Sequence, residues 1–414
     1  MARKFDDFIE AYLRYADDGF CPPQFSLWSC LSIVAAALER RVFLPWNDTF
    51  AYYPNIYVLL VSMPGDGKSV ALNKAVELLQ DANRKTSTLN IMPNQVTEAK
   101  FIELMGNGRS FTEHRGGKEI IHRQNAGYYW ASEASNSLKN VFGDFIACLT
   151  DYYDCPATWE RATKKDGKPI RLTNVCMNLL AGSTFDYLGK LVSDENIMGG
   201  FASRLIYVVS KNKHVNAQQF QLGGFDAVAE AERRHYREAL IEDLACIARM
   251  IGPMSAEPAF GRAWEAWYPV YEAKRRNLDS EKAQSILART NTNVLKVAML
   301  MSASESDDRI LKLRHWERAM ELVQKLQGDA PGVFRQARAQ SSQKSPGNLA
   351  SIILHAIETG GANLSFEELK GRIVARGHQM RNIDETISAL VACGALSRDG
   401  SGKPKILGDP NNYL

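Results

Sequence analysis

The stretch Asn55-Ile-Tyr-Val-Leu-Leu-Val-Ser-Met-Pro-Gly-Asp-Gly-Lys-Ser69 decides the fold that the sequence predicts. Its first half is a short apolar run with the composition of a buried strand. Pro64, Gly65 and Gly67 interrupt that run, and the apolar spacing over residues 70–83 is typical of a helix. A strand, a glycine-containing loop and a helix in this order predict an α/β protein.

The loop in this stretch has the residue spacing of a phosphate-binding loop. Residues 62–69 match the pattern Gly-x-x-x-x-Gly-Lys-[Ser/Thr] except at its first position, where Ser62 replaces glycine. Backbone N–H groups of such a loop and of the following helix converge on the phosphates of a nucleotide. We therefore expect ATP to contact Pro64, Gly65, Asp66, Gly67, Lys68, Ser69 and Val70.

If the loop binds phosphate, two of its residues have defined chemical roles. Lys68 would reach the β- and γ-phosphates, and the Ser69 hydroxyl would ligate Mg²⁺. A glycine-rich surface turn could carry Lys-Ser by chance, but the flanking strand and helix favour a phosphate-binding loop. A small-molecule kinase could use the same loop, so the loop predicts nucleotide binding and leaves the reaction open.

The bulk composition is that of a globular chain of two or three domains, with 414 residues of which 45% are hydrophobic and 23% charged. The net charge of +3 is too small to indicate a nucleic-acid partner. Seven scattered cysteines without a Cys-x-x-Cys pair predict neither a disulfide framework nor a zinc ribbon. Because no signal-peptide pattern or run of ~20 apolar residues is present, we expect a cytoplasmic protein without membrane contact.

Apolar runs continue after the loop and indicate how the chain is organised. Those at 127–131, 175–181 and 204–209 predict further strands of a mainly parallel, doubly wound sheet. The pattern becomes helical from about residue 226, and the chain ends in three helical patterns and a basic strand-turn-strand. The expected parts are an N-terminal helical lead-in (1–50), a P-loop ATPase core (51–225), a helical lid (226–330), a Gln-, Ser-, Gly- and Pro-rich linker (331–347) and a winged-helix domain (348–414).

Hydrolysis of ATP needs a carboxylate that orients a water molecule at the end of a second strand. Glu133 directly follows the 127–131 run, and we expect it to be this base. Ser132 stands where a metal-associated Asp is usual, so the metal would have one carboxylate fewer. The alternative for Glu133 is a solvated carboxylate at a strand end.

Three further polar residues lie beside predicted strands. Ser183 and Thr184 follow the 175–181 run, and they either sense the γ-phosphate or cap the next helix. Arg204 begins the last predicted strand and has the position of an arginine finger supplied to a neighbouring subunit. A structural salt bridge is the alternative role for Arg204.

Two basic stretches are candidates for contact with nucleic acid. Asp166-Gly167 predicts a hairpin turn that places Lys164, Lys165 and Lys168 at its tip, where lysines contact DNA phosphates or simply solvate the hairpin. Residues 109–123 carry basic and acidic side chains together, which is as typical of a mobile surface loop as of a DNA contact.

The order of five segments resembles a known family. The segments are PNIYVLLVSMPGDGKS, YYWASEAS, LLAGSTFDYL, GGFASRLIYVV and ILARTNTNVLKVAML. They are similar to the helicase-like P-loop ATPases of phages, prophages and plasmids over roughly residues 20–330. The resemblance implies an AAA+ or RecA-like ATPase of a replicative helicase or primase-helicase. It implies the roles given above for Lys68, Ser69, Glu133, Ser183 or Thr184 and Arg204, and a second sensor role for Arg289, which is otherwise a surface helix arginine.

Together these features predict an ATP-dependent DNA helicase or translocase that self-associates into a hexameric ring. It would serve replication of a phage or other mobile element, in the host cytoplasm if a phage encodes it, with replication proteins as further partners. Two alternatives remain open: a helicase loader or switch ATPase that grips a protein partner, and a protein-remodelling ATPase without a nucleic-acid role.

Overall fold

A computed structural model of the chain describes residues 3–17, 21–133, 144–162, 169–185, 187–188, 200–210, 227–278, 284, 287–326, 349, 352–354, 356–357, 364–375, 380–392, 396–398 and 403–406. The chain divides into two compact units, Met1–Val333 and Phe334–Leu414. Each unit is described by itself.

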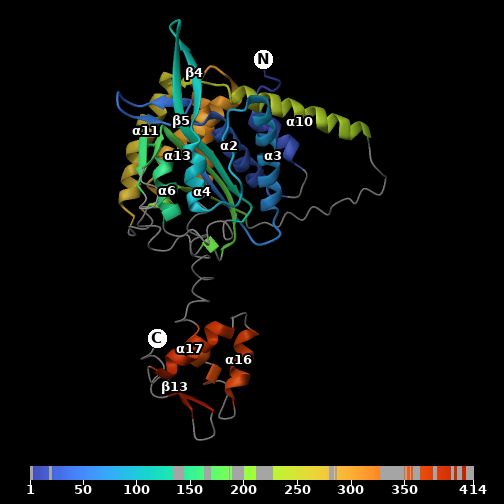
Figure 1. Ribbon diagram of the computed structural model, residues 1–414, viewed down its shortest axis with the longest axis vertical. Helices are drawn as coiled ribbons and strands as arrows, with labels where there is room; N and C mark the ends of the chain where they lie inside the picture. Colours follow the sequence, from blue (N-terminus) through green and yellow to red (C-terminus); the bar gives the residue numbers. More distant parts are fainter. Residues whose placement is uncertain are drawn as a thin grey trace. The chain divides into compact units, whose positions relative to one another are not determined.

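A five-stranded sheet forms the centre of the first unit (Figure 1). The pairs β5·β8, β8·β3 and β3·β9 are parallel, and within this sheet β4 alone runs antiparallel to its neighbour. The mainly parallel sheet predicted from the apolar runs is therefore confirmed. In spatial order the strands are β4 (Arg109–Arg115), β5 (Lys118–Ala131), β8 (Val175–Ser183), β3 (Tyr57–Val61) and β9 (Leu205–Val209).

The register of the parallel strands brings their carboxyl ends to one edge of the sheet. Val61, the last residue of β3, pairs with Ser183 at the end of β8 and with Val209 at the end of β9. Ala131 at the end of β5 pairs with Ala181 in β8. Because open parallel sheets bind ligands outside this edge, the loops that leave these strands are where a site is expected.

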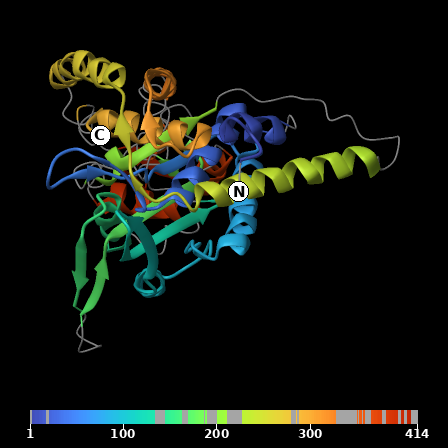
Figure 2. The same cartoon turned by 90° about the horizontal axis from the view of Figure 1, so that it is seen from above.

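Helices pack around the sheet (Figures 1 and 2). The buried α2 is apolar almost all round, and the amphipathic α1 packs on it through one face. The helices of the first unit include α1 (Phe8–Ala16), α2 (Pro23–Leu38), α3 (Lys68–Thr86), α4 (Glu98–Gly106), α6 (Asp144–Tyr153), α9 (Phe201–Arg204), α10 (Ala227–Ile247), α11 (Pro258–Arg276), α13 (Thr290–Glu305) and a helix over 313–326.

Side chains of β3 alternate between two helical layers. Val58 and Leu60 belong to the hydrophobic core that contains α2 and α3. Tyr57 faces the other side, where its hydroxyl donates to the Leu149 carbonyl oxygen of α6 over 2.7 Å. All five residues of β3 are buried, as expected of a strand covered on both faces.

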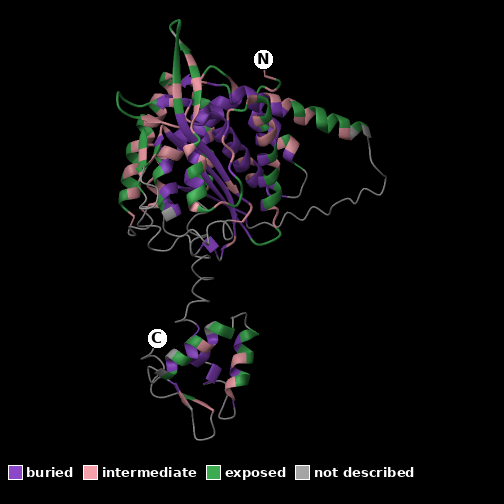
Figure 3. Cartoon of the chain, in the orientation of Figure 1, coloured by how far each residue is buried: buried purple, intermediate pink, exposed green. Residues whose placement is uncertain are grey.

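One continuous hydrophobic core joins the helices that precede and follow the sheet. It contains Trp28 of α2, Leu60 of β3 and Leu300 of α13. The three parts predicted within residues 1–330 therefore lie in one compact unit and share one core. Figure 3 shows this interior in purple around the central strands. The predicted linker 331–347 lies outside the described residues.

Two hairpins extend from the first unit. In the β4–β5 arm, which we define as residues 109–123, seven cross-strand pairs join β4 to the first part of β5. Figure 1 shows this arm projecting from the sheet, and most of its residues are exposed (Figure 3). The sequence predicted either a mobile surface loop or a DNA contact here. The loop is wrong, because these residues pair as two antiparallel strands. The second hairpin pairs β6 (Thr158–Arg161) with β7 (Ile170–Thr173) (Figure 2).

Short strands attach the helical part of the unit to the region before the central sheet. β1 pairs in parallel with β10 and antiparallel with β2, and β11 pairs in parallel with β12. These strands are β1 (Val42–Pro45), β2 (Ala51–Tyr52), β10 (Gly252–Pro253), β11 (Ser255–Ala256) and β12 (Ile310–Leu311). No helix among the described residues combines the length and apolar character that crossing a membrane requires.

The second unit has its own small core. Leu369, Ile373 and Ile387 are among the residues buried in it. Helix α16 begins with a capping box, in which the Ser365 hydroxyl accepts from the Glu368 amide and the Glu368 carboxylate accepts from the Ser365 amide. Its longer elements are α16 (Phe366–Val374), α17 (Met380–Ala392) and the antiparallel strands β13 (Leu396–Arg398) and β14 (Pro404–Ile406).

Candidate functional site

The glycine loop lies at the carboxyl edge of the sheet, between β3 and α3. Gly65 and Gly67 have φ angles of +90° and +78°, conformations that glycine adopts without steric strain. The Val70 and Ala71 amides donate to the Gly67 carbonyl oxygen, and no side chain among the described residues caps the amino end of α3. The amino end of the helix, with the positive end of its dipole, therefore faces outward for an anion. Pro64, Gly65, Ser69 and Val70 are exposed, which leaves this face of the loop open to solvent.

The Lys68 side chain folds back onto the loop that precedes it. Its ammonium donates to the carbonyl oxygens of Ser62 over 3.0 Å and Met63 over 2.9 Å, and to the Ser62 hydroxyl over 3.0 Å. Burial lowers the pKa of this ammonium from its ordinary value, and the carboxylates of Glu133 and Asp66 oppose that effect. The site therefore holds a desolvated cation whose hydrogen-bond acceptors are all uncharged.

Gly182 allows the ends of β5 and β8 to approach Lys68. A Cβ atom at position 182 would lie 2.4 Å from the Ser132 carbonyl oxygen and 3.8 Å from the Lys68 Cβ. Glu133 directly follows Ser132, and its charge acts on Lys68. The structure thus brings together two predicted site residues that lie 65 positions apart in the sequence, Lys68 and Glu133.

Ser183 and Thr184 lie at the same edge. The Ser183 carbonyl oxygen accepts from the Ser62 amide over 3.3 Å, which ties the end of β8 to the start of the glycine loop. The Ser183 side chain is fully buried, and its hydroxyl lies 3.2 Å from the Thr184 carbonyl oxygen. Thr184 is partly exposed, so of the two it has the more accessible hydroxyl.

The residues at this edge fit a nucleoside triphosphate with its magnesium ion. Backbone N–H groups at the amino end of α3 and the Lys68 ammonium are donors for phosphate oxygens. The exposed Ser69 hydroxyl, one residue from Lys68, has the chemistry of a Mg²⁺ ligand. Space for the ligand exists on the loop, since a Cβ atom at Gly65 would meet nothing within 4 Å.

Arg204 and Arg289 lie near the amino ends of the parallel strands, on the side of the sheet opposite the glycine loop. One carboxylate binds both of them. Arg204 is the last residue of α9, and the residue after it pairs with Tyr57 at the start of β3. Arg204 forms an ion pair with Asp154, and Arg289 Nη1 lies 2.9 Å from the other carboxylate oxygen of Asp154. The rise of roughly 3.3 Å per residue puts the length of β3, about 16 Å, between these arginines and the glycine loop.

A buried lysine reinforces this second cluster. The Lys296 ammonium donates to the carbonyl and side-chain oxygens of Asn55 over 2.9 and 2.8 Å. It lies 3.9 Å from the centre of the Tyr153 ring, and the guanidinium groups of Arg204 and Arg289 lie 5.8 and 5.7 Å from the same centre. Asp154, Tyr153 and Lys296 belong to no sequence motif, so nothing in the sequence marks them as neighbours.

The remaining predicted contacts concern the β6–β7 hairpin. Its strands pair from Thr158 with Thr173 to Arg161 with Ile170, which confirms the predicted hairpin flanks. Lys164, Lys165 and Lys168 lie outside the described residues. Their role in DNA binding stays a prediction.

Comparison with known proteins adds no assignment to this geometry: the chain matches no protein-family model, and no curated protein matches it. The resemblance to helicase-like ATPases of phages and plasmids therefore stays a prediction.

Proposed function

We propose that the chain binds ATP at the loop of residues 62–69 and hydrolyses it. One observation carries this proposal: the buried Lys68 ammonium, the uncapped amino end of α3 and Glu133 lie together at the carboxyl edge of a parallel sheet. A polyphosphate is the ligand that such a set of donors recognises best. On this view the first unit has a P-loop core.

In the proposed mechanism each residue has one task. Backbone N–H groups of the loop and the Lys68 ammonium would hold the β- and γ-phosphates. The Ser69 hydroxyl would hold the Mg²⁺ that enters with ATP, which would supply positive charge to the phosphates. Glu133 would orient a water molecule for attack on the γ-phosphorus and accept its proton. The bond from the γ-phosphorus to the β,γ-bridging oxygen would break, and ADP would leave with that oxygen. Thr184, with its accessible hydroxyl, or Ser183 would contact the γ-phosphate from β8.

Arg204 would act on the ATP of a neighbouring subunit. Its position at the far edge of the sheet supports action in trans, because about 16 Å of strand separates it from Lys68 of its own chain. The guanidinium is held by Asp154 and by the Gly200 carbonyl oxygen, which accepts from Nη1 over 2.8 Å. Arg289, on the same carboxylate, would approach the same interface. A ring of subunits, most simply a hexamer, provides such interfaces.

We further propose that hydrolysis drives movement along DNA, as a helicase or translocase in replication of a phage or other mobile element. The β6–β7 hairpin, which extends from the first unit, supports this use because three lysines lie in the sequence between its two strands. A helicase loader or switch ATPase is the second candidate, favoured by the separate second unit with its own core, which could grip a protein partner as a winged helix.

ATP turnover with and without single-stranded DNA, together with unwinding of a forked duplex, tests these proposals. Lys68→Ala should abolish ATP binding, whereas Lys85→Ala on the same helix, an exposed lysine paired with Glu238, should leave it unchanged. Glu133→Gln should bind ATP normally but hydrolyse it roughly 10²- to 10⁴-fold more slowly. Normal ATP affinity in the Lys68→Ala protein would refute the nucleotide site.

Mixing variants tests the arginine in trans. Lys68→Ala and Arg204→Ala proteins should each be inactive alone, but a mixture should regain activity because some interfaces pair an intact Lys68 with an intact Arg204. No recovery from subunits that are shown to exchange would exclude action in trans. An ATP hydrolysis rate that DNA does not change, together with no unwinding of the fork, would favour the loader or remodelling ATPase over the translocase.

A further inference from the structure

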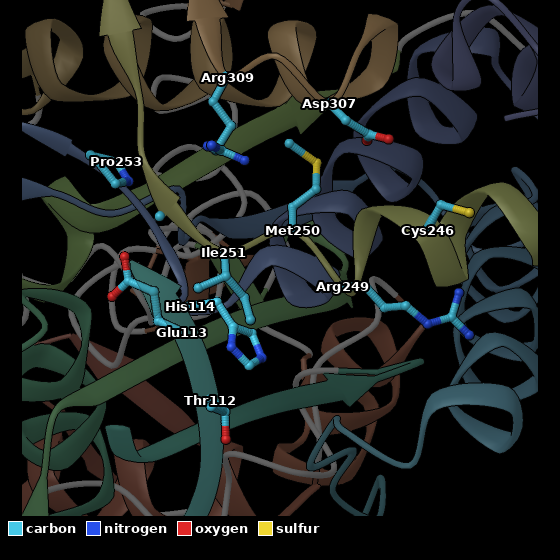
Figure 4. A pocket seen from close by; sticks show the side chains of 11 residues that line it. Thr112, Glu113, His114, Cys246, Arg249, Met250, Ile251, Pro253, Asp307 and Arg309 are labelled. Atoms are coloured by element: carbon cyan, nitrogen blue, oxygen red, sulfur yellow. The ribbon is translucent and has the colours of Figure 1, made fainter. Parts of the chain in front are cut away.

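A cavity away from the glycine loop lies beside the β4–β5 arm. Its volume is about 550 Å³, within the range of cavities that hold a nucleotide-sized group. Figure 4 shows Arg309 above the cavity, Glu113 and His114 entering from β4, and Arg249 to one side, in the turn that follows α10. A smaller cavity of about 150 Å³ shares Glu113, Ile251 and Gly252 with the first and continues along the arm.

The arginine in the wall of this cavity is held by an unusual backbone conformation. Arg309 has a φ of +56°, which costs a residue with a side chain on the order of 1 kcal/mol or more and is often found at functional sites. Its carbonyl oxygen accepts from the Ser255 amide over 3.0 Å, so pairing of β11 with β12 fixes this turn. The chain thus holds a strained residue where its side chain lines the cavity.

The Arg309 guanidinium has an unused donor. Its Nε atom is buried and has no hydrogen-bond partner among the described residues. Gly252 leaves space beside it, because a Cβ atom there would lie 3.7 Å from Arg309 Nε and 3.9 Å from Glu113 Oε1. A buried donor of a charged group without an acceptor is costly, and an anionic ligand would satisfy it.

The other charges at the cavity favour an anion. Arg249 and Arg123, which line the larger and the smaller cavity, form no side-chain hydrogen bond or ion pair within the described part of the chain. The two carboxylates are already engaged: Glu113 lies 2.8 Å from His122, and Asp307 lies 2.5 Å from Arg3. Three arginines therefore remain available for phosphate oxygens.

We propose that the cavity and the arm bind the phosphodiester backbone of a single nucleic-acid strand, with one nucleotide in the cavity. The arm favours a strand over a free nucleotide, since seven cross-strand pairs give it a length of about 20 Å, enough for several successive phosphates. Arg123 lines the smaller cavity, and the exposed Ile121 pairs with Thr112, which lines the larger one. They offer a charge for phosphate and an apolar surface for a base. This inference rests on the proposed function for its nucleic-acid partner but requires no ATP hydrolysis.

Binding of a fluorescein-labelled oligothymidylate to the full chain, followed by anisotropy without nucleotide at several salt concentrations, tests the proposal. The Arg249→Ala/Arg309→Ala protein should bind on the order of tenfold more weakly, and the slope of log affinity against log salt should fall by about 1.4, or 0.7 for each lost phosphate contact. Arg249→Lys/Arg309→Lys should recover part of the affinity because the charge is kept.

The matched control removes the same charge elsewhere. Arg84→Ala/Arg276→Ala neutralises two exposed arginines that pair with Asp81 and Glu272. An equal loss of affinity in this control would overturn the proposal, because net charge alone would then explain binding. Displacement of the strand by AMP at similar concentration would also overturn it in favour of a mononucleotide site.

The same measurement in a Lys68→Ala background separates this inference from the proposed function. If the cavity variants lose affinity there too, strand binding at the arm stands, whether or not the chain hydrolyses ATP. If the cavity variants bind the oligothymidylate as tightly as the native chain and DNA still stimulates their ATP turnover, the proposed function stands and strand binding at the cavity is refuted.

Discussion

The Ser62 hydroxyl accepts a hydrogen bond from the Lys68 ammonium over 3.0 Å. Ser62 is the one position at which the loop departs from the phosphate-loop pattern, and its side chain contacts the residue on which that pattern depends. An incoming phosphate must compete with this hydroxyl and with the carbonyl oxygens of Ser62 and Met63 for the ammonium. The departure therefore bears on nucleotide affinity.

Ser62→Ala should tighten ATP binding. Two carbonyl acceptors remain, so the gain should be at most about 1 kcal/mol, or about fivefold in Kd. Isothermal titration calorimetry with a non-hydrolysable ATP analogue measures this gain in affinity. Ser62→Gly, which restores the phosphate-loop pattern, should also tighten binding. Weaker binding in both proteins would mean that the hydroxyl helps to hold the phosphate.

Gly182→Ala should impair hydrolysis and stability together. Its Cβ atom would lie 2.4 Å from the Ser132 carbonyl oxygen, so the end of β5 must move and carry Glu133 with it. We expect a loss of about 1–3 kcal/mol in the free energy of unfolding, with reduced turnover at saturating ATP. Gly261→Ala in α11 is the control: its Cβ atom meets nothing within 4 Å, so it should be neutral or stabilising. Unchanged turnover in the Gly182→Ala protein would contradict the close approach.

Lys296→Met should destabilise the first unit. The substitution keeps the length of the side chain but leaves two oxygens of the buried Asn55 without their donor, at a cost of about 2 kcal/mol. The midpoint of urea unfolding reports the loss, and Lys325→Met at an exposed position should unfold as the native chain does. A rise in stability would show that desolvation of the ammonium outweighs its hydrogen bonds.

Acid should destabilise the chain through His315. Its Nδ1 accepts from the Lys312 amide over 3.0 Å, so the folded state needs the neutral ring, with Nε2 donating to Glu305 over 3.1 Å. Burial lowers the pKa of His315 below its ordinary value of 6.5, although Glu305 acts in the opposite sense. Because the folded pKa is the lower one, stability is full above about pH 6.5 and declines as the pH falls toward the folded pKa.

Urea unfolding of the native chain, His315→Gln and His235→Gln at pH values from 7 downward measures this dependence. The exposed His235 is the matched control, and its substitution should keep the slope of stability against pH. His315→Gln should be less stable at pH 7 and show a shallower slope just below pH 6.5. A slope as steep as that of the native chain would assign the acid sensitivity to other groups.

Much of the central sheet could be predicted from the sequence, because its signal is local. The apolar run before Ser62 and the glycines after it indicate a strand, a turn and a helix, and these lie where expected. The β4–β5 arm could not be predicted. Its two strands are held together by backbone hydrogen bonds, and most of their side chains are exposed. The sequence therefore lacks the alternation of apolar and polar residues that indicates a strand.

Some residues of the candidate site could likewise be predicted from the sequence, and others could not. Lys68 and Ser69 could be named from spacing alone, and Glu133 from its place after an apolar run. The sharing of Asp154 by Arg204 and Arg289 depends on chain segments that meet only after folding, so no spacing rule indicates it. The sequence does not indicate Arg309 either, because its backbone angle and its proximity to Gly252 arise only in the folded chain.

The common interior of the first unit limits how the chain can be shortened for experiments. A fragment that stops at Val209 would lack α10 and α13, and the apolar wall formed by Trp28 and its neighbours in α2 would face water. Such a fragment should precipitate, and its failure to retain ATP would report collapse of the scaffold. The shortest piece worth expressing extends through the helix at 313–326.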